Sequence, residues 1–189
     1  MTGTEDVSAF CRAVEARSEE HRKAMDVAVS EGWWAIAGSV LRMELDSLIR
    51  VNYLLRNPDT RERILASCAA GKGFKDHRSR IPDADMVRIA ETGNPWVRNV
   101  YHFGNRLVHL TNVHDYAWAD PFRAFEKDER EEVIGYLNHY HGSAVEGPSL
   151  DSSATFLDIA AYAPHVLRKI ASNLRISSER LYQEVTGDS

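Results

Sequence analysis

Apolar residues recur at intervals of three and four along most of the chain, and alternation of apolar and polar residues is rare. This spacing is typical of amphipathic α-helices and gives almost no strand signal. It predicts helices over residues 6–30, 33–56, 58–70, 83–92, 95–109 and 127–141 and a long helical region over 152–186, kinked at Pro164. The pattern therefore predicts an all-α protein.

The connections between these helices are mostly short. Two Asn-Pro pairs place a capping residue before a proline that suits the first helical turn, namely Asn57-Pro58 and Asn94-Pro95. The longer connections are an irregular segment over 110–125 and a linker over 142–151. Because short connections favour antiparallel neighbours, we expect one domain over 1–189, an up-and-down bundle of about six to seven helices.

The helix predicted over 33–56 is the most apolar and is expected to lie at the centre of the core. Its apolar stripe includes Leu41, Leu48, Val51 and Leu55. Glu44 lies on the same stripe, and a carboxylate buried there needs a partner. Two interpretations stay open: an ion pair with an Arg of a neighbouring helix, or a carboxylate that orients His109 or Arg106.

The helix predicted over 95–109 has one polar and one apolar side. At about 100° per residue, its polar residues gather within about 60° of one another or just beside that arc. They are Arg98, His102, Asn105 and His109, with Asn99 and Arg106 alongside. This side contains no Asp, Glu or Lys, whereas solvated helix faces usually mix Lys and Glu. The composition indicates a groove or an interface, and Gly104 leaves room for a close approach.

Composition and charge limit the classes of function. The chain has 189 residues, 43% of them hydrophobic, which suits one globular domain. Cys11 and Cys68 form no disulfide framework, and no leader or membrane-spanning stretch is evident, so we expect a cytoplasmic protein without a membrane partner. A net charge of -5 argues against broad nucleic-acid binding but leaves a small phosphate site open.

The polar side of the 95–109 helix carries groups that handle anions. Arg presents a planar fork to phosphate oxygens, and His transfers protons near neutral pH. These are the parts of metal-independent RNA cleavage. In that chemistry His109 would act as base or acid, Arg106 or Arg98 would contact the phosphate, and Asn105 would orient them. This interpretation requires no cofactor.

A metal site is a further interpretation of the histidines. Six of the eight lie between His102 and His165. Helical ligand pairs normally stand three or four residues apart, but His102 and His109 are seven apart, and His109 and His114 are five apart. No HExxH motif or Cys pair accompanies them. A His-rich metal-binding hydrolase or sensor is therefore the second alternative.

Two segments resemble helices of the HEPN domains. SVLRMELDSLIRVNYLLRNPDTRERI (Ser39–Ile64) is similar to their apolar helix with an internal Glu and Arg, a Tyr-Leu-Leu and an Asx-Pro turn. YHFGNRLVHLT (Tyr101–Thr111) is similar to their later helix with a Tyr and a Val-His pair. The resemblance implies an all-α bundle that dimerises through the His-bearing helix. It also implies an association with RNA cleavage in toxin–antitoxin and phage-defence systems.

The strict catalytic motif of that family is absent. Catalytic HEPN domains carry Arg, then four to six residues, then His; after Arg98, His102 comes too early and His109 too late. Only His109, Arg98, Asn99 and Asn105 match family positions. We therefore predict a noncatalytic or degenerate HEPN-like homodimer that binds RNA or a protein partner, with a metal-independent ribonuclease as the first alternative. The expected ligand or interface residues are His102, Asn99, Glu44, His114 and Trp118.

Overall fold

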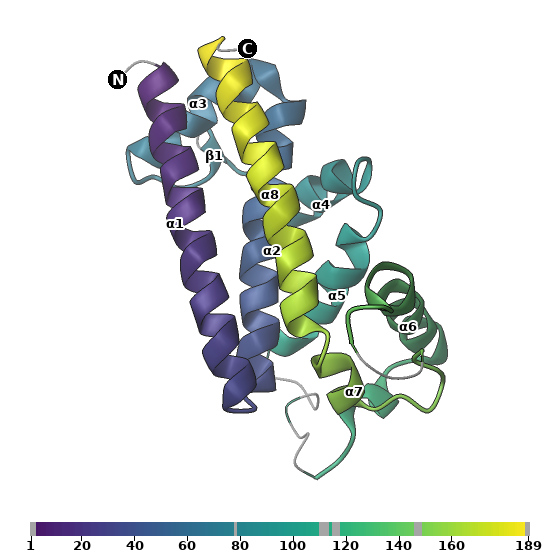
Figure 1. Cartoon of the computed structure of the whole chain (residues 1–189). Coiled ribbons are helices and arrows are strands. Elements are labelled where there is room, and N and C mark those ends of the chain that lie inside the picture. The colour runs from purple at the N-terminus through teal and green to yellow at the C-terminus, as the bar shows by residue number, and fades with distance from the viewer. Residues whose placement is uncertain (1–2, 78, 110–113, 115–117, 146–148, 188–189) are drawn as a thin grey trace. The chain divides into compact units, whose positions relative to one another are not determined.

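The computed structural model describes residues 3–77, 79–109, 114, 118–145 and 149–187 and is dominated by helices (Figure 1). The prediction of an all-α helical bundle is confirmed, since the only sheet in these ranges is a short hairpin. The elements are α1 (Gly3–Ser30), α2 (Trp34–Arg56), α3 (Pro58–Ala69), β1 (Lys75–Asp76), β2 (Ser79–Arg80), α4 (Asp83–Glu91), α5 (Val97–Val108), η2 (Pro121–Ala124), α6 (Lys127–His141), α7 (Phe156–Ala160) and α8 (Ala163–Thr186).

The chain divides into two compact units. The first unit contains Met1–Glu20, Glu44–Val97 and Ile170–Ser189, and the second contains His21–Met43 and Arg98–Lys169. Helices α1, α2 and α8 each contribute one part to the first unit and one part to the second. The single domain expected from the sequence stays a prediction.

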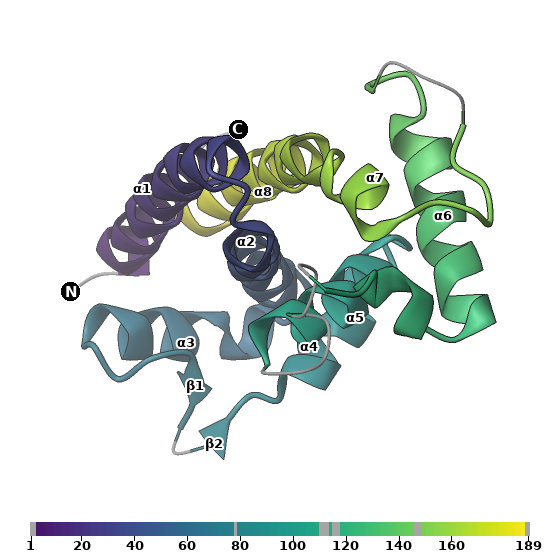
Figure 2. The ribbon, with the colours of Figure 1, turned by 90° about the horizontal axis from the view of Figure 1, so that it is seen from below.

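In the first unit, residues of α1, α2 and α8 run side by side (Figure 1). Their apolar faces form a core together with α3 and α4. Its most deeply buried members include Val7, Leu45, Leu48, Ile49, Val51, Leu54, Ile64, Leu65, Met86, Val97, Ile170, Leu174 and Leu181. The β1–β2 hairpin lies beside α3 (Figure 2), and Arg63 of α3 donates to Asp76 of β1 over 3.0 Å. The apolar stripe of α2 is thus a core element, as its sequence predicts.

In the second unit, Asp120 connects two segments that are distant in sequence. Its Oδ1 accepts hydrogen bonds from the backbone N–H of Phe122 over 3.1 Å and of Phe156 over 3.0 Å. The first bond caps η2, and the second holds the start of α7. Phe122 and Phe156 are both buried, so one carboxylate positions two core aromatic side chains.

The helical region predicted over 152–186 is wrong in form. It consists of two helices, α7 and α8. Residues 152–155, which open the predicted region, are not helical. Thr155 and Asp158 form a capping box at α7, and Pro164 is the second residue of α8. A proline has no N–H to contribute, so it fits the first turn of a new helix at no cost. Pro164 therefore starts a helix instead of kinking one.

Some smaller expectations also change. Asn57 precedes α3 as predicted, but its amide donates to the Tyr53 carbonyl instead of capping the helix. Helix α5 begins at Val97, two residues after the proline expected to start it. Trp33, the first residue of the helix predicted over 33–56, lies just before the first turn of α2 and is 51% exposed.

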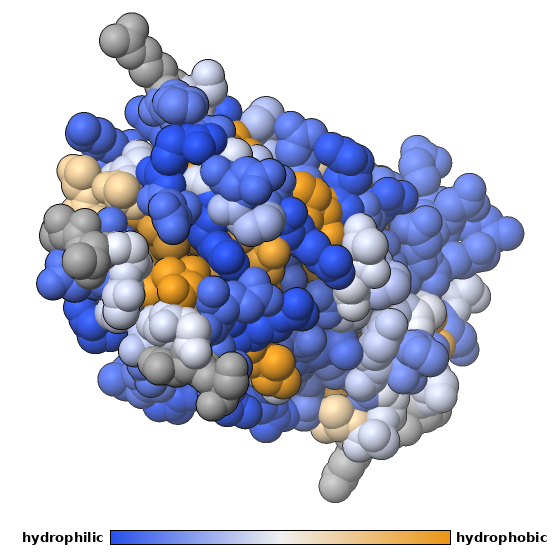
Figure 3. All heavy atoms as spheres, turned by 90° about the horizontal axis from the view of Figure 1, so that it is seen from above, coloured by the Kyte–Doolittle hydropathy of each residue, from blue (hydrophilic) through white to orange (hydrophobic). Residues whose placement is uncertain are grey.

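Hydrophilic side chains cover most of the face shown in Figure 3, and apolar side chains appear there in separate small areas. Among the described residues, no helix is long and apolar enough to cross a membrane.

Two glycines set how closely α5 packs on α2 in the second unit. A Cβ added to Gly38 would overlap Cδ1 of Leu107 and lie 2.9 Å from its Cβ. A Cβ added to Gly104 would lie 3.1 Å from Cβ of Arg42. Each glycine thus admits a side chain of the facing helix, and the close approach predicted at Gly104 is confirmed.

We expect Gly38→Ala to lower the free energy of unfolding by about 1–3 kcal/mol, because an extra methyl group cannot be accommodated beside Leu107 without displacing it. Gly135→Ala on the exposed side of α6 is the control, since no atom lies within 4 Å of its added Cβ. There, replacing a helical glycine should stabilise the protein by up to about 1 kcal/mol. Urea unfolding followed by circular dichroism measures both values, and a neutral Gly38→Ala would contradict the packing.

Candidate functional site

The polar side predicted for α5 divides into exposed and half-buried residues. Arg98, His102 and His109 are exposed, with His109 lying one residue beyond the end of the helix. Asn99, Asn105 and Arg106 are half-buried. On the opposite side Val100 and Leu107 are buried. We call Arg98, His102 and His109 the exposed stripe, because these three side chains are the part of the polar side that solvent reaches most freely.

Asn105 is engaged by a residue that the sequence did not single out. Arg42 of α2 donates from Nε to Oδ1 of Asn105 over 2.9 Å. Its guanidinium also lies 4.3 Å from the ring centroid of Tyr101, in cation–π geometry. The small residue at Gly104 permits this approach. Asn105 therefore stabilises the packing of α5 on α2, and its side-chain oxygen already accepts one hydrogen bond.

Arg106 is engaged by α6. Its Nη2 donates to both carboxylate oxygens of Glu129, over 2.6 Å and 2.7 Å, and its guanidinium lies 4.3 Å from the ring centroid of Phe125. Glu129 in turn accepts from the backbone N–H of Glu126 at the start of α6. Helix α5 contains no acidic residue, and α6 thus places the carboxylate of Glu129 beside its polar side.

The prediction that Glu44 orients Arg106 or His109 finds no support. Glu44 is fully buried and belongs to the first unit, where Oε1 accepts a hydrogen bond from the Ser18 hydroxyl over 2.5 Å. The carboxylate beside Arg106 is that of Glu129. A helical period places Glu44 correctly in the core, but it carries no information about which helix supplies a partner.

Two further predicted residues lie in or beside the segment over 110–125, of which residues 110–113 and 115–117 are outside the described part of the chain. Nε2 of His114 lies 3.1 Å from the carbonyl oxygen of Leu107, so the imidazole is a hydrogen-bond donor there in the tautomer protonated at Nε2. Trp118 is 89% exposed. His114 is therefore connected to the end of α5, whereas the Trp118 ring is open to solvent.

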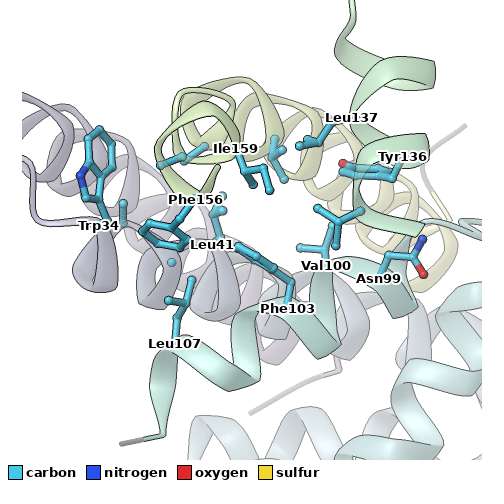
Figure 4. Close-up of a pocket in the computed structure, with 16 residues that line it drawn as sticks. Trp34, Leu41, Asn99, Val100, Phe103, Leu107, Tyr136, Leu137, Phe156 and Ile159 are labelled. Carbon is cyan, nitrogen blue, oxygen red and sulfur yellow. The ribbon is translucent and has the colours of Figure 1, made fainter. Parts of the chain in front are cut away.

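The apolar side of α5 lines a small pocket in the second unit (Figure 4). Its volume is about 50 Å³, and its walls come from α2, α5, α6, α7 and α8, including Trp34, Phe103, Leu107, Phe156 and Ile159. One buried water needs about 10–15 Å³, and ligand pockets usually measure several hundred. The pocket is therefore a gap in the core and is too small for an ordinary metabolite.

A metal centre is not formed by the histidines that the structure describes. Within the described ranges, no three His, Cys, Asp or Glu side chains are grouped so that they could hold a metal ion. His102 and His109 are exposed on α5, and His141 is buried on α6. His102 and His109 lie along one side of one helix and His141 lies on another helix, so these histidines do not gather into a three-ligand group.

No protein-family model matches the chain, and searches of curated proteins and of solved structures found no match. The resemblance to HEPN domains therefore rests on the segments Ser39–Ile64 and Tyr101–Thr111 alone.

The pair of Arg106 and Glu129 should stabilise the second unit measurably. We expect a double-mutant cycle of Arg106→Gln and Glu129→Gln to give a coupling energy of about 0.5–1 kcal/mol, the upper part of the range for partly exposed pairs, because both carboxylate oxygens are engaged. Lys127→Gln with Glu131→Gln is the matched control, since that pair is more exposed and 3.6 Å apart. Urea unfolding measures both cycles; equal couplings would show that Arg106 is not specially held.

Proposed function

We propose that the chain is a noncatalytic HEPN-like module that binds single-stranded RNA through the exposed stripe of α5. The observation that carries this proposal is the exposure of Arg98, His102 and His109 along one side of a helix that contains no acidic residue. Arg and protonated His donate charge-assisted hydrogen bonds to phosphate oxygens. A homodimer and a cytoplasmic location belong to the same proposal.

The length of the exposed stripe favours a run of phosphates over a single one. With a rise of about 1.5 Å per residue, Arg98 and His102 stand about 6 Å apart along the helix axis, and Arg98 and His109 about 16 Å. Three donors spread over that length suit an extended backbone. The ring of Trp118 is 89% exposed, so a base could stack on it.

The same distances argue against cleavage. A base or acid and a stabilising cation must act on one phosphate at the same time. Arg98 is too far along the helix from His109 to share a phosphate with it. Arg106 is close in sequence, but Glu129 binds its guanidinium and neutralises its charge. These contacts support binding without catalysis.

We expect the full chain to bind a fluorescein-labelled, mixed-sequence single-stranded RNA, and the double variant His102→Ala/His109→Ala to bind it at least about fivefold more weakly. Arg98→Gln should reduce the slope of log affinity against log salt by about 0.7, the value for one lost phosphate contact on a single strand. Fluorescence polarisation at several salt concentrations measures both effects. His139→Ala is the control, since His139 is an exposed helical histidine on α6.

The outcomes separate the alternatives. If the double variant binds RNA with unchanged affinity, or if His139→Ala loses as much affinity, the exposed stripe does not bind RNA. The same RNA should stay intact during incubation in EDTA. Cleavage that disappears in His109→Ala would instead establish the metal-independent ribonuclease.

A further inference from the structure

A second group of histidines lies in the second unit, where the C-terminal part of α6 meets the first turns of α8. We call His141, His165, Arg168 and Lys169 the basic cluster. His141 is buried at 7% exposure, Arg168 is exposed, and the other two are half-buried. The proposed function uses none of these residues.

Hydrogen bonds define the protonation state of the two imidazoles. Arg168 donates from Nη2 to Nδ1 of His165 over 2.6 Å. A guanidinium can only donate, so Nδ1 of His165 carries a lone pair and its proton is on Nε2. The Tyr136 hydroxyl lies 3.2 Å from Nε2 of His141 and can donate to it when that imidazole is neutral. In this state His165 keeps one N–H that is not used by Arg168.

Aromatic rings hold the second cation in place. Nζ of Lys169 lies 4.0 Å from the ring centroid of Tyr140, and the Tyr140 ring lies 5.3 Å from that of Tyr136. The Tyr136 ring in turn contacts His141, at 5.5 Å between centroids. Lys169, Tyr140, Tyr136 and His141 therefore form a continuous set of contacts between α8 and α6.

The members of the basic cluster disfavour one another's positive charge. Burial first, and then the positive charges of Lys169, His165 and Arg168, lower the pKa of His141 to about 4. Burial and the neighbouring Arg168 also lower the pKa of His165, and burial lowers the pKa of Lys169. Near neutral pH the cluster thus consists of two cations and two neutral imidazoles, a combination that a bound anion would stabilise.

We propose that the basic cluster binds a small tetrahedral oxyanion such as inorganic phosphate or sulfate. Arg168 and Lys169 supply the charges, and Nε2–H of His165 supplies a further donor. An anion next to these groups also favours the imidazolium form of His141 over the neutral form. Binding should therefore take up a proton and become tighter as the pH falls toward about 4, the pKa of His141 in the free chain.

The test uses the full chain and sodium sulfate, whose charge does not change in this pH range, against sodium chloride of equal ionic strength. At about ten times the Kd, sulfate should raise the Tm by about 3–6 °C, and isothermal titration should give one site per chain. Arg168→Gln/Lys169→Gln should lose at least about 90% of the affinity. Lys127→Gln/Arg175→Gln removes the same charge from two exposed positions and should leave the affinity unchanged.

Histidine NMR signals give a second readout that needs no variant. Sulfate should move the His141 ring signal toward its protonated position at about pH 5, and His141→Asn should bind sulfate without the increase at low pH. No sulfate response in the wild-type chain would overturn the proposal. So would a response that survives in the Arg168/Lys169 double variant, or one that is lost equally in the Lys127/Arg175 control.

Discussion

The contact between Leu107 and Gly38 fixes the rotation of α5 about its own axis, and the second unit depends on it. Leu107 occupies the space that a side chain at position 38 would fill. One helical turn away on each helix, Arg42 lies against Gly104 and bonds Asn105. These contacts bury the apolar side of α5 against α2. Beside the half-buried Asn105, the other polar residues Arg98, His102 and His109 stay exposed and form the exposed stripe.

The polar side of α5 therefore performs two physical tasks. Asn105 and Arg106 form contacts with Arg42 and Glu129, and those contacts hold helices together. Arg98, His102 and His109 are exposed, and the proposed RNA binding depends on them. A sequence pattern that looks uniform along one face of a helix thus combines structural and accessible positions, and the difference is decided by the residues on α2 and α6.

The sequence predicts most of the fold because helical periodicity is a local property. The ends of α2, α3 and α6 lie within one residue of their expected positions. The site is predicted less completely, since its decisive contacts join distant segments. Arg106 and Glu129 are 23 residues apart on different helices, and no periodic pattern relates them. Glu44 shows the same limit, because its burial followed from its stripe whereas its contact with Ser18 did not. Arg42 was not predicted as the residue in contact with α5, although the small Gly104 indicated a close packing contact at this point.

Asp120 has a consequence for the cooperativity of the second unit. Its single carboxylate holds both Phe122 and Phe156, so the intervening chain, which includes α6, is closed into a loop at its base. Because one carboxylate makes both bonds, its loss would release η2 and α7 together. The basic cluster takes His141 from α6 and its other three residues from α8, which follows α7, so the proposed anion site depends on the loop that Asp120 closes.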